Sequence, residues 1–337
     1  MSEYNGMNYS AGILGIGKCV PEKVLSNKDL ESMVDTSNEW IVQRTGIHER
    51  RIMESDTPLH ELGSKAAMEA LKNAGLTPDK IDLIIVTTET PDYLTPSMAC
   101  LIQKSIGAAN AAAFDLNAAC TGAVYGLTVA SQFINTGYYK YVLVVSCEGL
   151  SRVVDWKDRK TCVLFGDGAA AMVVGQVEKG YGILATYIGA DGSMGHNITI
   201  PCCYVNSEES EKRLSENKMV IWMDGSEVFK FAVRVMIQAT ETVLNQSGIS
   251  IKDVSLIIPH QANMRIIESA AKRLDIPPER VFTNVHKYGN TSSASIPIAL
   301  IESIEKGLVS KGSYIVLVGF GGGLTWASAL IKWSKEE

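Results

Sequence analysis

A pattern repeated 173 residues apart, the offset from Ile81 to Val254, is the strongest constraint on how this chain folds. Three pairs of segments share that offset: 70–85 with 243–258, 117–123 with 290–296, and 141–145 with 314–318. One offset across three segments is not expected from chance hydrophobicity, so we predict a duplicated βα unit. The seam is predicted near Gly180, which divides the 337 residues into an N-terminal half, 1–179, and a C-terminal half, 180–337.

The expected strands are continuous runs of Val, Ile and Leu, such as Leu83–Thr87, and they alternate with helical segments such as 62–73. This alternation is typical of an α/β fold, with largely parallel sheets covered on both faces. In such sheets functional groups gather at the carboxyl ends of the strands. Cys120, His260, Asn290 and the glycine run 319–323 all follow predicted strands in the two halves, so we expect a site between the halves.

Cys120 follows an apolar run and precedes an uncharged stretch of small residues that reads as a buried helix. The start of a helix favours a thiolate, which is the nucleophilic form of cysteine. Free cysteine is also among the most buried residue types, so a core cysteine is the alternative for Cys120 considered alone. His260 and Asn290 likewise have structural alternatives, a core histidine and a helix cap.

Charge, hydropathy and cysteine content give no indication of a nucleic-acid-binding, membrane-spanning or secreted protein. A net charge of −6 gives no reason to expect nucleic-acid binding. No apolar run approaches the ~18 residues typical of a membrane helix, and residues 1–5 lack a signal-peptide pattern. The seven scattered cysteines are typical of free thiols in a reducing cytoplasm. Cys202–Cys203 lacks metal-site spacing, so we read it as a loop feature and expect no metal.

Five ordered motifs resemble β-ketoacyl-acyl-carrier-protein synthase III of the thiolase superfamily. They are Asn117-Ala-Ala-Cys-Thr-Gly122, Phe165-Gly-Asp-Gly-Ala169, Pro259-His-Gln-Ala-Asn263, Tyr288-Gly-Asn-Thr-Ser292 and Gly319-Phe-Gly-Gly-Gly323. The segment 34–47 also resembles that family, and the resemblance covers about residues 10 to 333. It implies a thiolase-like fold, in which the duplicated halves form a five-layer αβαβα sandwich.

The resemblance implies a decarboxylative Claisen condensation of a short acyl-CoA, by expectation acetyl-CoA, with malonyl-acyl-carrier-protein. This reaction initiates type II fatty acid biosynthesis. Cys120 is expected to form the acyl-enzyme, His260 and Asn290 to stabilise the enolate, and the backbone N–H groups of Cys120 and Gly322 to form the oxyanion hole. No cofactor or metal is expected, because decarboxylation itself generates the carbanion.

The resemblance also implies binding residues. For coenzyme A they are Thr36, Trp40, Arg44 and Arg159, with Trp40 and Arg159 on either side of the adenine. For the acyl carrier protein we expect Arg265, together with Lys230 and Lys272, to form a basic patch for an acidic partner. Leu94 or Thr95 falls where the family shapes the acyl pocket, with a contribution from across the interface of a homodimer.

Other functions remain open at this stage. The main rival is a synthase III-like condensing enzyme of secondary metabolism that uses another primer, and a second is an acyltransferase that stops at acyl-Cys120. A non-catalytic carrier-protein-binding scaffold is the alternative from another class. Ordinary packing of Trp40 and a solvated face for the three basic residues are the structural alternatives for the binding sites.

Overall fold

The computed structural model describes residues 10–201 and 219–336, and the prediction about Cys202–Cys203 therefore lies outside the described residues. Within them the sequence repeat is also a repeat of structure. Elements that match at the 173-residue offset include the strands β4 (Leu83–Thr87) and β11 (Val254–Pro259), the strands β6 (Tyr141–Gly149) and β12 (Tyr314–Gly321), and the 3₁₀ turns η2 (Ala119–Thr121) and η7 (Ser292–Ala294).

Two mixed sheets form the framework. The first contains, in spatial order, β1 (Ser10–Cys19), β7 (Asp167–Val177), β6, β4 and β5 (Ala112–Leu116), and the second contains β11, β12, β13 (Thr325–Lys332) and β8 (Gly182–Ala190). All strands of the first sheet precede residue 178 and all strands of the second follow residue 181. The division into two domains at that point stays a prediction.

The prediction of largely parallel sheets is wrong. β4 pairs in parallel with β5 and β6, but β7 is antiparallel to both of its neighbours. In the second sheet only β11 and β12 are parallel, because a tight turn after Gly321 reverses the chain from β12 into β13. A short hairpin permits antiparallel pairing, whereas a parallel pair needs a long crossover.

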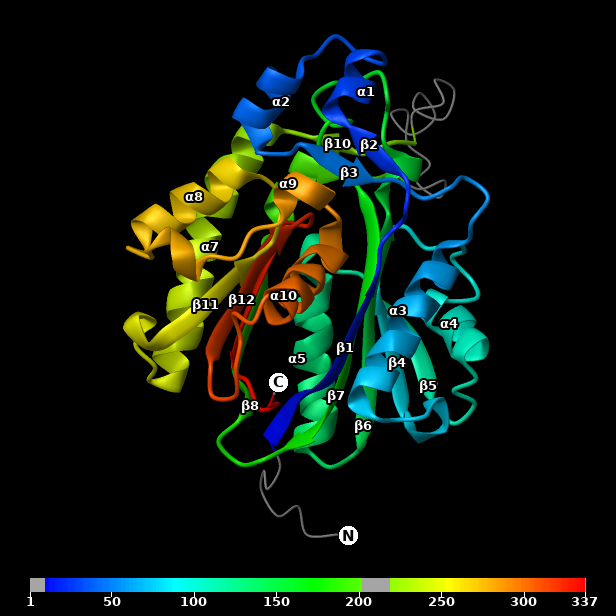
Figure 1. Cartoon of the computed structure of the whole chain (residues 1–337), viewed down its shortest axis with the longest axis vertical. Helices are drawn as coiled ribbons and strands as arrows, with labels where there is room; N and C mark the ends of the chain where they lie inside the picture. Colours follow the sequence, from blue (N-terminus) through cyan, green and yellow to red (C-terminus); the bar gives the residue numbers. More distant parts are fainter. Residues whose placement is uncertain (1–9, 202–218, 337) are drawn as a thin grey trace.

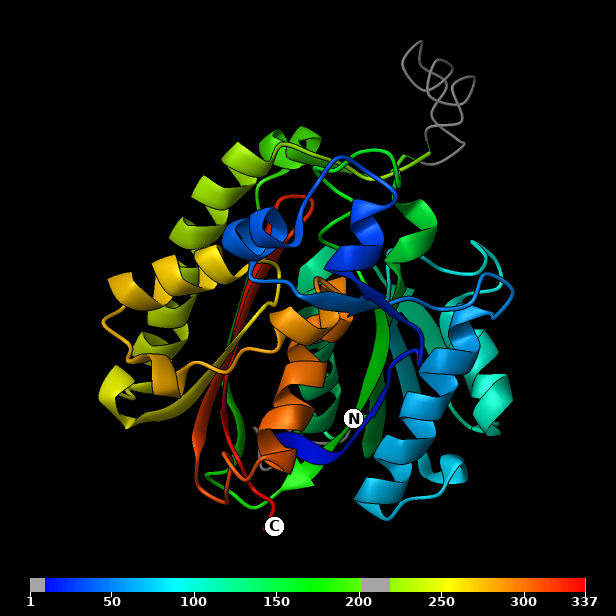
Figure 2. The same cartoon turned by 45° about the horizontal axis from the view of Figure 1, so that its top comes forward.

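Five layers result, which confirms the predicted αβαβα sandwich (Figure 1). Helices α5 (Gly122–Asn135) and α10 (Ser295–Glu305) lie between the sheets, where they form one apolar core with both inner faces. Helices α3 (Leu59–Ala74) and α4 (Met98–Ile106) cover the outer face of the first sheet. Helices α7 (Gly225–Ser247) and α8 (Met264–Arg273) cover the second sheet, as the tilted view also shows (Figure 2).

The outer helices of the two halves end in the same way. α3 ends at Gly75 and α7 at Gly248, which is 173 residues later, and both glycines adopt left-handed backbone with φ of 66° and 69°. A residue without a Cβ adopts this conformation without steric cost and lets the last carbonyls of the helix be capped. The matched ends direct β4 and β11 into equivalent positions in their sheets.

Short elements cover the carboxyl ends of the central strands. They are β2 (Val24–Ser26), α1 (Asn27–Glu31), α2 (Asn38–Thr45), β3 (Glu49–Arg51), β9 (Ile198–Thr199), β10 (Trp222–Met223) and α9 (Val285–Tyr288). The side chain of Ser26 caps the start of α1. Among residues 10–201 and 219–336, no helix combines the length and apolar character that crossing a membrane requires.

Candidate active site

Cys120 lies in the 3₁₀ turn η2, between the end of β5 and the first residue of α5. The sequence predicted a strand followed directly by a helix, and the structure inserts this turn. Ala119, immediately before the cysteine, has a φ of 49°, a conformation that costs a residue with a Cβ about 1–3 kcal/mol. Strain of this kind persists where the surrounding structure fixes it, and here it orients Cys120 into a pocket.

The thiol of Cys120 is not stabilised as a thiolate in this resting structure. Burial raises its pKa well above the ordinary value, and the nearby carboxyl groups of Glu89 and Glu148 raise it further, while a hydrogen bond with Ser292 opposes them. Burial and the two carboxyl groups thus oppose the thiolate that the start of a helix was expected to favour.

His260 follows β11 directly and is buried. Its backbone N–H donates to the carbonyl of Val318 at 2.8 Å, and the edge of its ring meets Phe320 at a centroid distance of 5.3 Å. Nδ1 lies 2.6 Å from Oγ of Ser295. Burial lowers the pKa of the imidazole to about 3, so the ring is neutral at physiological pH.

The partner of Nδ1 indicates the tautomer of His260. Oγ of Ser295 accepts a hydrogen bond from the N–H of Gln261 at 3.4 Å, and His260 Nδ1 is the acceptor within reach of the Ser295 hydroxyl proton. With Nδ1 accepting, the ring proton resides on Nε2. Nε2 is buried without a hydrogen-bond partner among the described residues, and His260 lines the pocket, so Nε2–H is a donor kept for a bound molecule.

Asn290 is fixed by its own backbone and by its side-chain oxygen. Its N–H donates to the carbonyl of Leu164 at 2.8 Å, and its carbonyl accepts from Gly166 N–H at 3.0 Å. Its Oδ1 accepts from the N–H of Ser292 at 2.8 Å, which leaves the Nδ2 amide to face the pocket. A Cβ on Gly166 would lie 2.4 Å from the carbonyl of Tyr288, which explains the glycine of that motif.

The glycine run after β12 packs directly against η2. A Cβ on Gly321 would lie 2.7 Å from the backbone nitrogen of Cys120, so only glycine allows this approach. Thr325 secures the contact, since its hydroxyl is 3.0 Å from that of Thr121 and 3.2 Å from the carbonyl of Ala118. The backbone of residues 321–322 is thereby held beside the reactive sulfur.

One pocket of about 280 Å³ brings together the predicted catalytic and oxyanion residues and two of those predicted for coenzyme A. Its lining includes Cys120, His260, Asn290, Gly322, Trp40 and Arg44. The remaining walls are mainly apolar, with Phe165, Ile198, Ile221, Val228 and Phe320 among them. A largely apolar chamber with a few polar groups is suited to an acyl chain and its carbonyl.

The residues predicted for coenzyme A lie at or beside this pocket. The guanidinium of Arg159 lies over the ring of Trp40, 5.2 Å from its centroid, and donates to the carbonyl of Asp35 at 2.8 Å. Oγ1 of Thr36 is buried without a partner among the described residues. Lys160, which the sequence analysis did not select, lines the pocket, whereas Arg159 and Thr36 do not.

The residues predicted for the carrier protein and the acyl pocket lie outside the chamber. Arg265 and Lys272 are exposed on α8, and exposed Lys230 on the adjacent α7 pairs with Glu227 at 2.7 Å. Leu94 is 64% exposed, and its neighbour Thr95 is also exposed. Neither lines the pocket of this chain.

Three polar residues of the site were missed. Glu89 lines the pocket, Ser292 contacts Glu89 at 2.6 Å, and Ser295 holds His260. The two serines belong to the quoted loop around Asn290 or follow it closely. Glu89 stands two residues after the end of β4, so the carboxyl-end argument that selected His260 also applies to it.

Comparison with known proteins gives consistent matches. The model of the family described as "3-Oxoacyl-[acyl-carrier-protein (ACP)] synthase III" matches residues 114–192, and the corresponding C-terminal model matches residues 244–333. The β-ketoacyl-[acyl-carrier-protein] synthase III of Caldanaerobacter subterraneus subsp. tengcongensis is 53% identical over 97% of this chain and 98% of its own length. The synthase III of Geobacillus kaustophilus is 50% identical over 96% and 99%.

Solved structures agree with these relatives. The crystal structure of 3-oxoacyl-[acyl-carrier-protein] synthase III from Aquifex aeolicus superposes with a TM-score of 0.90 at 47% identity, covering 96% of this chain and all of its own. The priming β-ketosynthase of the R1128 polyketide pathway superposes with a TM-score of 0.92 at 33% identity over the full length of both chains.

Proposed function

This chain belongs to the β-ketoacyl-[acyl-carrier-protein] synthase III family, and from that premise we propose how its own residues carry out the reaction. The enzyme is an acyltransferase that condenses a short acyl-CoA with malonyl-acyl-carrier-protein and initiates fatty acid biosynthesis. The products are 3-ketoacyl-acyl-carrier-protein, coenzyme A and carbon dioxide. The preferred primer is proposed to be acetyl-CoA.

Cys120 is the nucleophile of the first half-reaction. Its sulfur attacks the thioester carbonyl of the acyl-CoA, the bond to the coenzyme A sulfur breaks, and acyl-Cys120 remains. Thioester exchange suits cysteine, because the attacking and departing groups are both thiolates. The position of Cys120 in the wall of a largely apolar pocket supports this role, since the acyl chain is then held away from water.

His260 and Asn290 act in the second half-reaction. Nε2–H of His260 and Nδ2–H of Asn290 donate to the thioester oxygen of the malonyl group, on which negative charge develops as carbon dioxide leaves. The hydrogen bonds at Nδ1 of His260 and Oδ1 of Asn290 support this assignment, because they turn the donor atoms toward the pocket. A neutral histidine is the appropriate donor for an enolate whose carbon must remain nucleophilic.

The enolate carbon then attacks the carbonyl of acyl-Cys120. The backbone N–H groups of Cys120 and Gly322 are proposed to hold the resulting oxyanion, and the close packing of residues 321–322 on η2 supports this. Loss of one such donor typically costs about 3 kcal/mol of transition-state stabilisation. We propose no metal and no resident cofactor, because decarboxylation supplies the carbanion.

Coenzyme A is proposed to enter past Trp40, Arg44, Arg159 and Thr36. An adenine between Trp40 and Arg159 needs roughly 7 Å, or two contact layers of about 3.5 Å, whereas the two groups are 5.2 Å apart. Arg159 is exposed, so its side chain is free to swing outward and close on the base. A planar guanidinium is well suited to this stacking.

The carrier protein is proposed to dock on α8 and α7. Arg265 in the first turn of α8 and Lys272 two turns further lie on one exposed face, while Glu227 offsets the charge of Lys230. Arg265 lies two residues from the pocket-lining Asn263, so a partner held there can reach the pocket with its prosthetic arm. Acidic partners are steered by such local basic groups.

A homodimer is also proposed, in the cytoplasm. β5 is an edge strand of the first sheet, and its Phe114 is 38% exposed. Exposed edge strands with apolar side chains are normally covered, and a second copy would cover this one. The exposed loop that carries Leu94 and Thr95 follows β4, the strand paired with β5, so in a dimer it would reach the partner's acyl pocket.

The convergence of Cys120, His260 and Asn290 on one pocket carries this proposal. Its test is single-turnover mixing with labelled acetyl-CoA and then malonyl-acyl-carrier-protein, for the wild type and Cys120→Ser. We expect one equivalent of coenzyme A and labelled protein in the first step, and acetoacetyl-acyl-carrier-protein after the second. An enzyme that takes no label from any acyl donor would disprove the assignment of Cys120.

A second candidate is a priming synthase of secondary metabolism, favoured by the fold similarity to the R1128 priming β-ketosynthase. It uses the same three residues with another primer. A burst of coenzyme A from longer or aromatic acyl-CoA substrates, without one from acetyl-CoA, would support this candidate. An acyltransferase that stops at acyl-Cys120 would instead release no product after malonyl-acyl-carrier-protein is added.

A further inference from the structure

Glu89 is a carboxyl group in the active-site pocket that the proposed mechanism does not use. We infer that Glu89 accepts the proton of Cys120 through the hydroxyl of Ser292 during acyl transfer, and returns it to the departing coenzyme A thiolate. This inference rests on the proposed role of Cys120 as nucleophile. It adds a base to the first half-reaction, in which a neutral thiol must lose its proton.

The geometry forms a continuous chain from sulfur to carboxylate. Oγ of Ser292 donates to Oε1 of Glu89 at 2.6 Å, and Glu89 lines the same pocket as Cys120. The turns η2 and η7, which carry Cys120 and Ser292, pack against each other, and Ser292 influences the thiol through a hydrogen bond. Ser292 is held in place by its backbone, since its N–H donates to Oδ1 of Asn290 at 2.8 Å and its φ is 47°. Strained conformations of residues other than glycine cluster at functional sites.

His260 is the usual candidate for a base beside a cysteine, but here it is already protonated on the nitrogen that faces the pocket. In the tautomer inferred from the contacts of Ser295, Nδ1 accepts and Nε2 carries the ring proton, so Nε2 acts as a donor. Accepting a second proton would create a buried imidazolium, and burial lowers the pKa of His260 to about 3. The proton of Cys120 therefore goes elsewhere.

Glu89 has a buried neighbour, Glu148, whose hydrogen bonds indicate that it is neutral. Oγ of Ser293 lies 3.0 Å from the carbonyl of Thr87 and 2.6 Å from Oε1 of Glu148. A hydroxyl has one proton, so if it donates to the carbonyl, the 2.6 Å contact requires a proton on Glu148. Burial raises the pKa of Glu148 to about 8, which is consistent with a protonated Glu148 at neutral pH.

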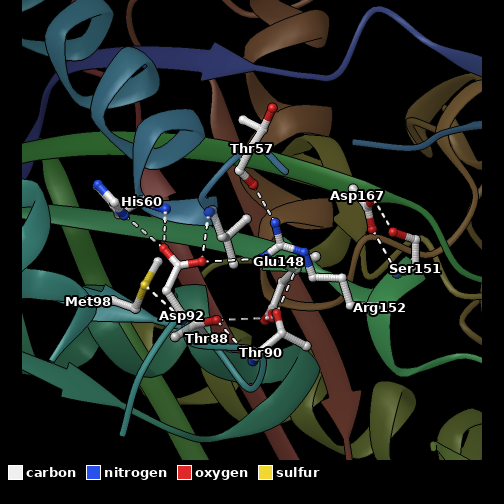
Figure 3. A network of polar contacts seen from close by, with 12 residues as sticks. Thr57, His60, Thr88, Thr90, Asp92, Met98, Glu148, Ser151, Arg152 and Asp167 are labelled. Atoms are coloured by element: carbon white, nitrogen blue, oxygen red, sulfur yellow. Dashed lines mark hydrogen bonds and ion pairs between the residues drawn. The ribbon is translucent and has the colours of Figure 1, made fainter. Parts of the chain in front are cut away.

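Glu148 has further polar partners in Thr88 and Thr90, at 3.3 and 2.9 Å from Oε2 (Figure 3). The same oxygen accepts the backbone N–H of Glu89 at 3.1 Å. Two adjacent carboxyl groups do not both ionise readily, so a neutral Glu148 allows Glu89 to carry the negative charge. In the ionised form, Oε1 of Glu89 accepts the hydrogen bond of the Ser292 hydroxyl.

The steps balance. As Cys120 Sγ attacks the thioester carbon, its proton passes to Ser292 Oγ, and the proton of that hydroxyl passes to Oε1 of Glu89. The bond between the carbonyl carbon and the coenzyme A sulfur breaks, and the departing thiolate takes back one proton along the same path. Glu89 is again a carboxylate, and the net products are acyl-Cys120 and coenzyme A thiol.

Several charged and titratable groups share this environment and set the pH dependence. Glu148 and Cys120 face Glu89 directly. His260, Arg44 and Lys160 line the same pocket, and burial raises the pKa of Glu89. The rate of acyl transfer is therefore expected to rise with pH as Glu89 becomes ionised. Because its pKa is raised, the pKa of this base is closer to that of the thiol from which it takes the proton.

The test is the rate of coenzyme A release in a single turnover with acetyl-CoA, as a function of pH, for the wild type, Glu89→Gln and Ser292→Ala. General base catalysis contributes typically 10²–10⁴-fold, so acyl transfer should slow about 100-fold or more in Glu89→Gln. The pH-dependent rise assigned to Glu89 should disappear. Condensation by enzyme that has been fully acylated beforehand should change less than threefold.

Alkylation of Cys120 by iodoacetamide separates this role from a purely electrostatic one. Glu89→Gln removes a negative charge that raises the thiol pKa, so its alkylation should be faster than in the wild type at a given alkaline pH. A base relay predicts slower acyl transfer together with faster alkylation. Acyl transfer as fast as the wild type, or equal losses in both half-reactions, would overturn the proposal. Cys120→Ser tests the underlying nucleophile separately, because it abolishes both labelling and alkylation at this site.

Discussion

Asn117 and Asn290 occupy the same position in the two halves and make the same hydrogen bond. Oδ1 of Asn117 accepts the N–H of Ala119 at 3.2 Å, and Oδ1 of Asn290 accepts the N–H of Ser292 at 2.8 Å. Ala119 and Ser292 then share left-handed backbone, with φ of 49° and 47°. One duplicated turn thus presents Cys120 from the first half and the Asn290 amide from the second.

This duplication supplies a matched pair of substitutions. Asn290→Asp keeps the oxygen that caps Ser292 but replaces the Nδ2 donor with a negative charge next to the developing enolate. Decarboxylation of malonyl-acyl-carrier-protein should fall at least about 100-fold, in line with the loss of one charge-stabilising donor. Coenzyme A release from acetyl-CoA measures the other half-reaction, and it should change much less.

Asn117→Asp makes the same chemical change in the first half, where the side chain is exposed. It should keep condensation within about threefold of the wild type, because its oxygen still caps Ala119. Equal losses in the two variants would show that the turn itself, and not the Asn290 amide, carries the effect.

Gly321 offers a test of the oxyanion site. In Gly321→Ala the new Cβ would meet the nitrogen of Cys120 at 2.7 Å, so the glycine run must move away from the reactive sulfur. We expect condensation to slow about 100-fold, comparable to the loss of one oxyanion donor, with the pocket still able to bind acyl-CoA. Steady-state kinetics and the thermal midpoint of unfolding together separate this effect from misfolding.

Gly192→Ala is the control for adding a methyl group elsewhere, since nothing lies within 4 Å of a Cβ at that position. Activity and stability close to the wild type are expected there. A Gly321→Ala enzyme that condenses at the wild-type rate would remove the glycine run from the oxyanion site.

Much of this arrangement was accessible from the sequence, for identifiable reasons. The sequence repeat predicted the turns at η2 and η7, because both halves retain small residues in the turn before the helix. Cys120 and His260 were predicted as site residues because each follows the end of a predicted strand. Tertiary surroundings were not accessible: the pKa of Cys120 depends on Glu89, which follows β4, and on Glu148, which lies in β6. The prediction of largely parallel strands was also wrong, because continuous apolar runs are typical of any strand buried on both faces, whether it pairs in parallel or antiparallel.

Arg265 should affect only the half-reaction that uses the carrier protein. Arg265→Glu reverses a charge on the exposed face of α8. We expect the KM for malonyl-acyl-carrier-protein to rise about tenfold, most strongly at low ionic strength, since the steering of a charged partner is screened by salt. Acyl transfer from acetyl-CoA should remain within about twofold of the wild type.

Lys252→Glu is the matched control. Lys252 is exposed and precedes β11, whereas His260 follows that strand, so the same charge change occurs at the opposite end of the sheet. It should leave the KM for the carrier substrate unchanged. An equal rise in both variants would indicate that net charge, and not a docking site on α8, governs the encounter.

Glu148 should make stability depend on pH. Its pKa in the folded enzyme is about 8, because of burial and the neighbouring Glu89, against roughly 4.3 in an unfolded chain. Below about pH 4 both states hold the proton and stability is unaffected. As the pH rises the unfolded state loses its proton first, so unfolding becomes progressively more favourable until the pH passes about 8.

Glu148→Gln removes this penalty, because an amide cannot ionise and still offers a donor to Ser293 and an acceptor to Thr90. At about 1.4 kcal/mol per pH unit, the variant should gain a few kcal/mol over the wild type between pH 5 and 8, and no more beyond that range. Urea unfolding at several pH values measures this difference. A difference that stays constant from pH 5 to 8 would mean that Glu148 is ionised in the folded enzyme, and the assignment of the negative charge to Glu89 would then also fail.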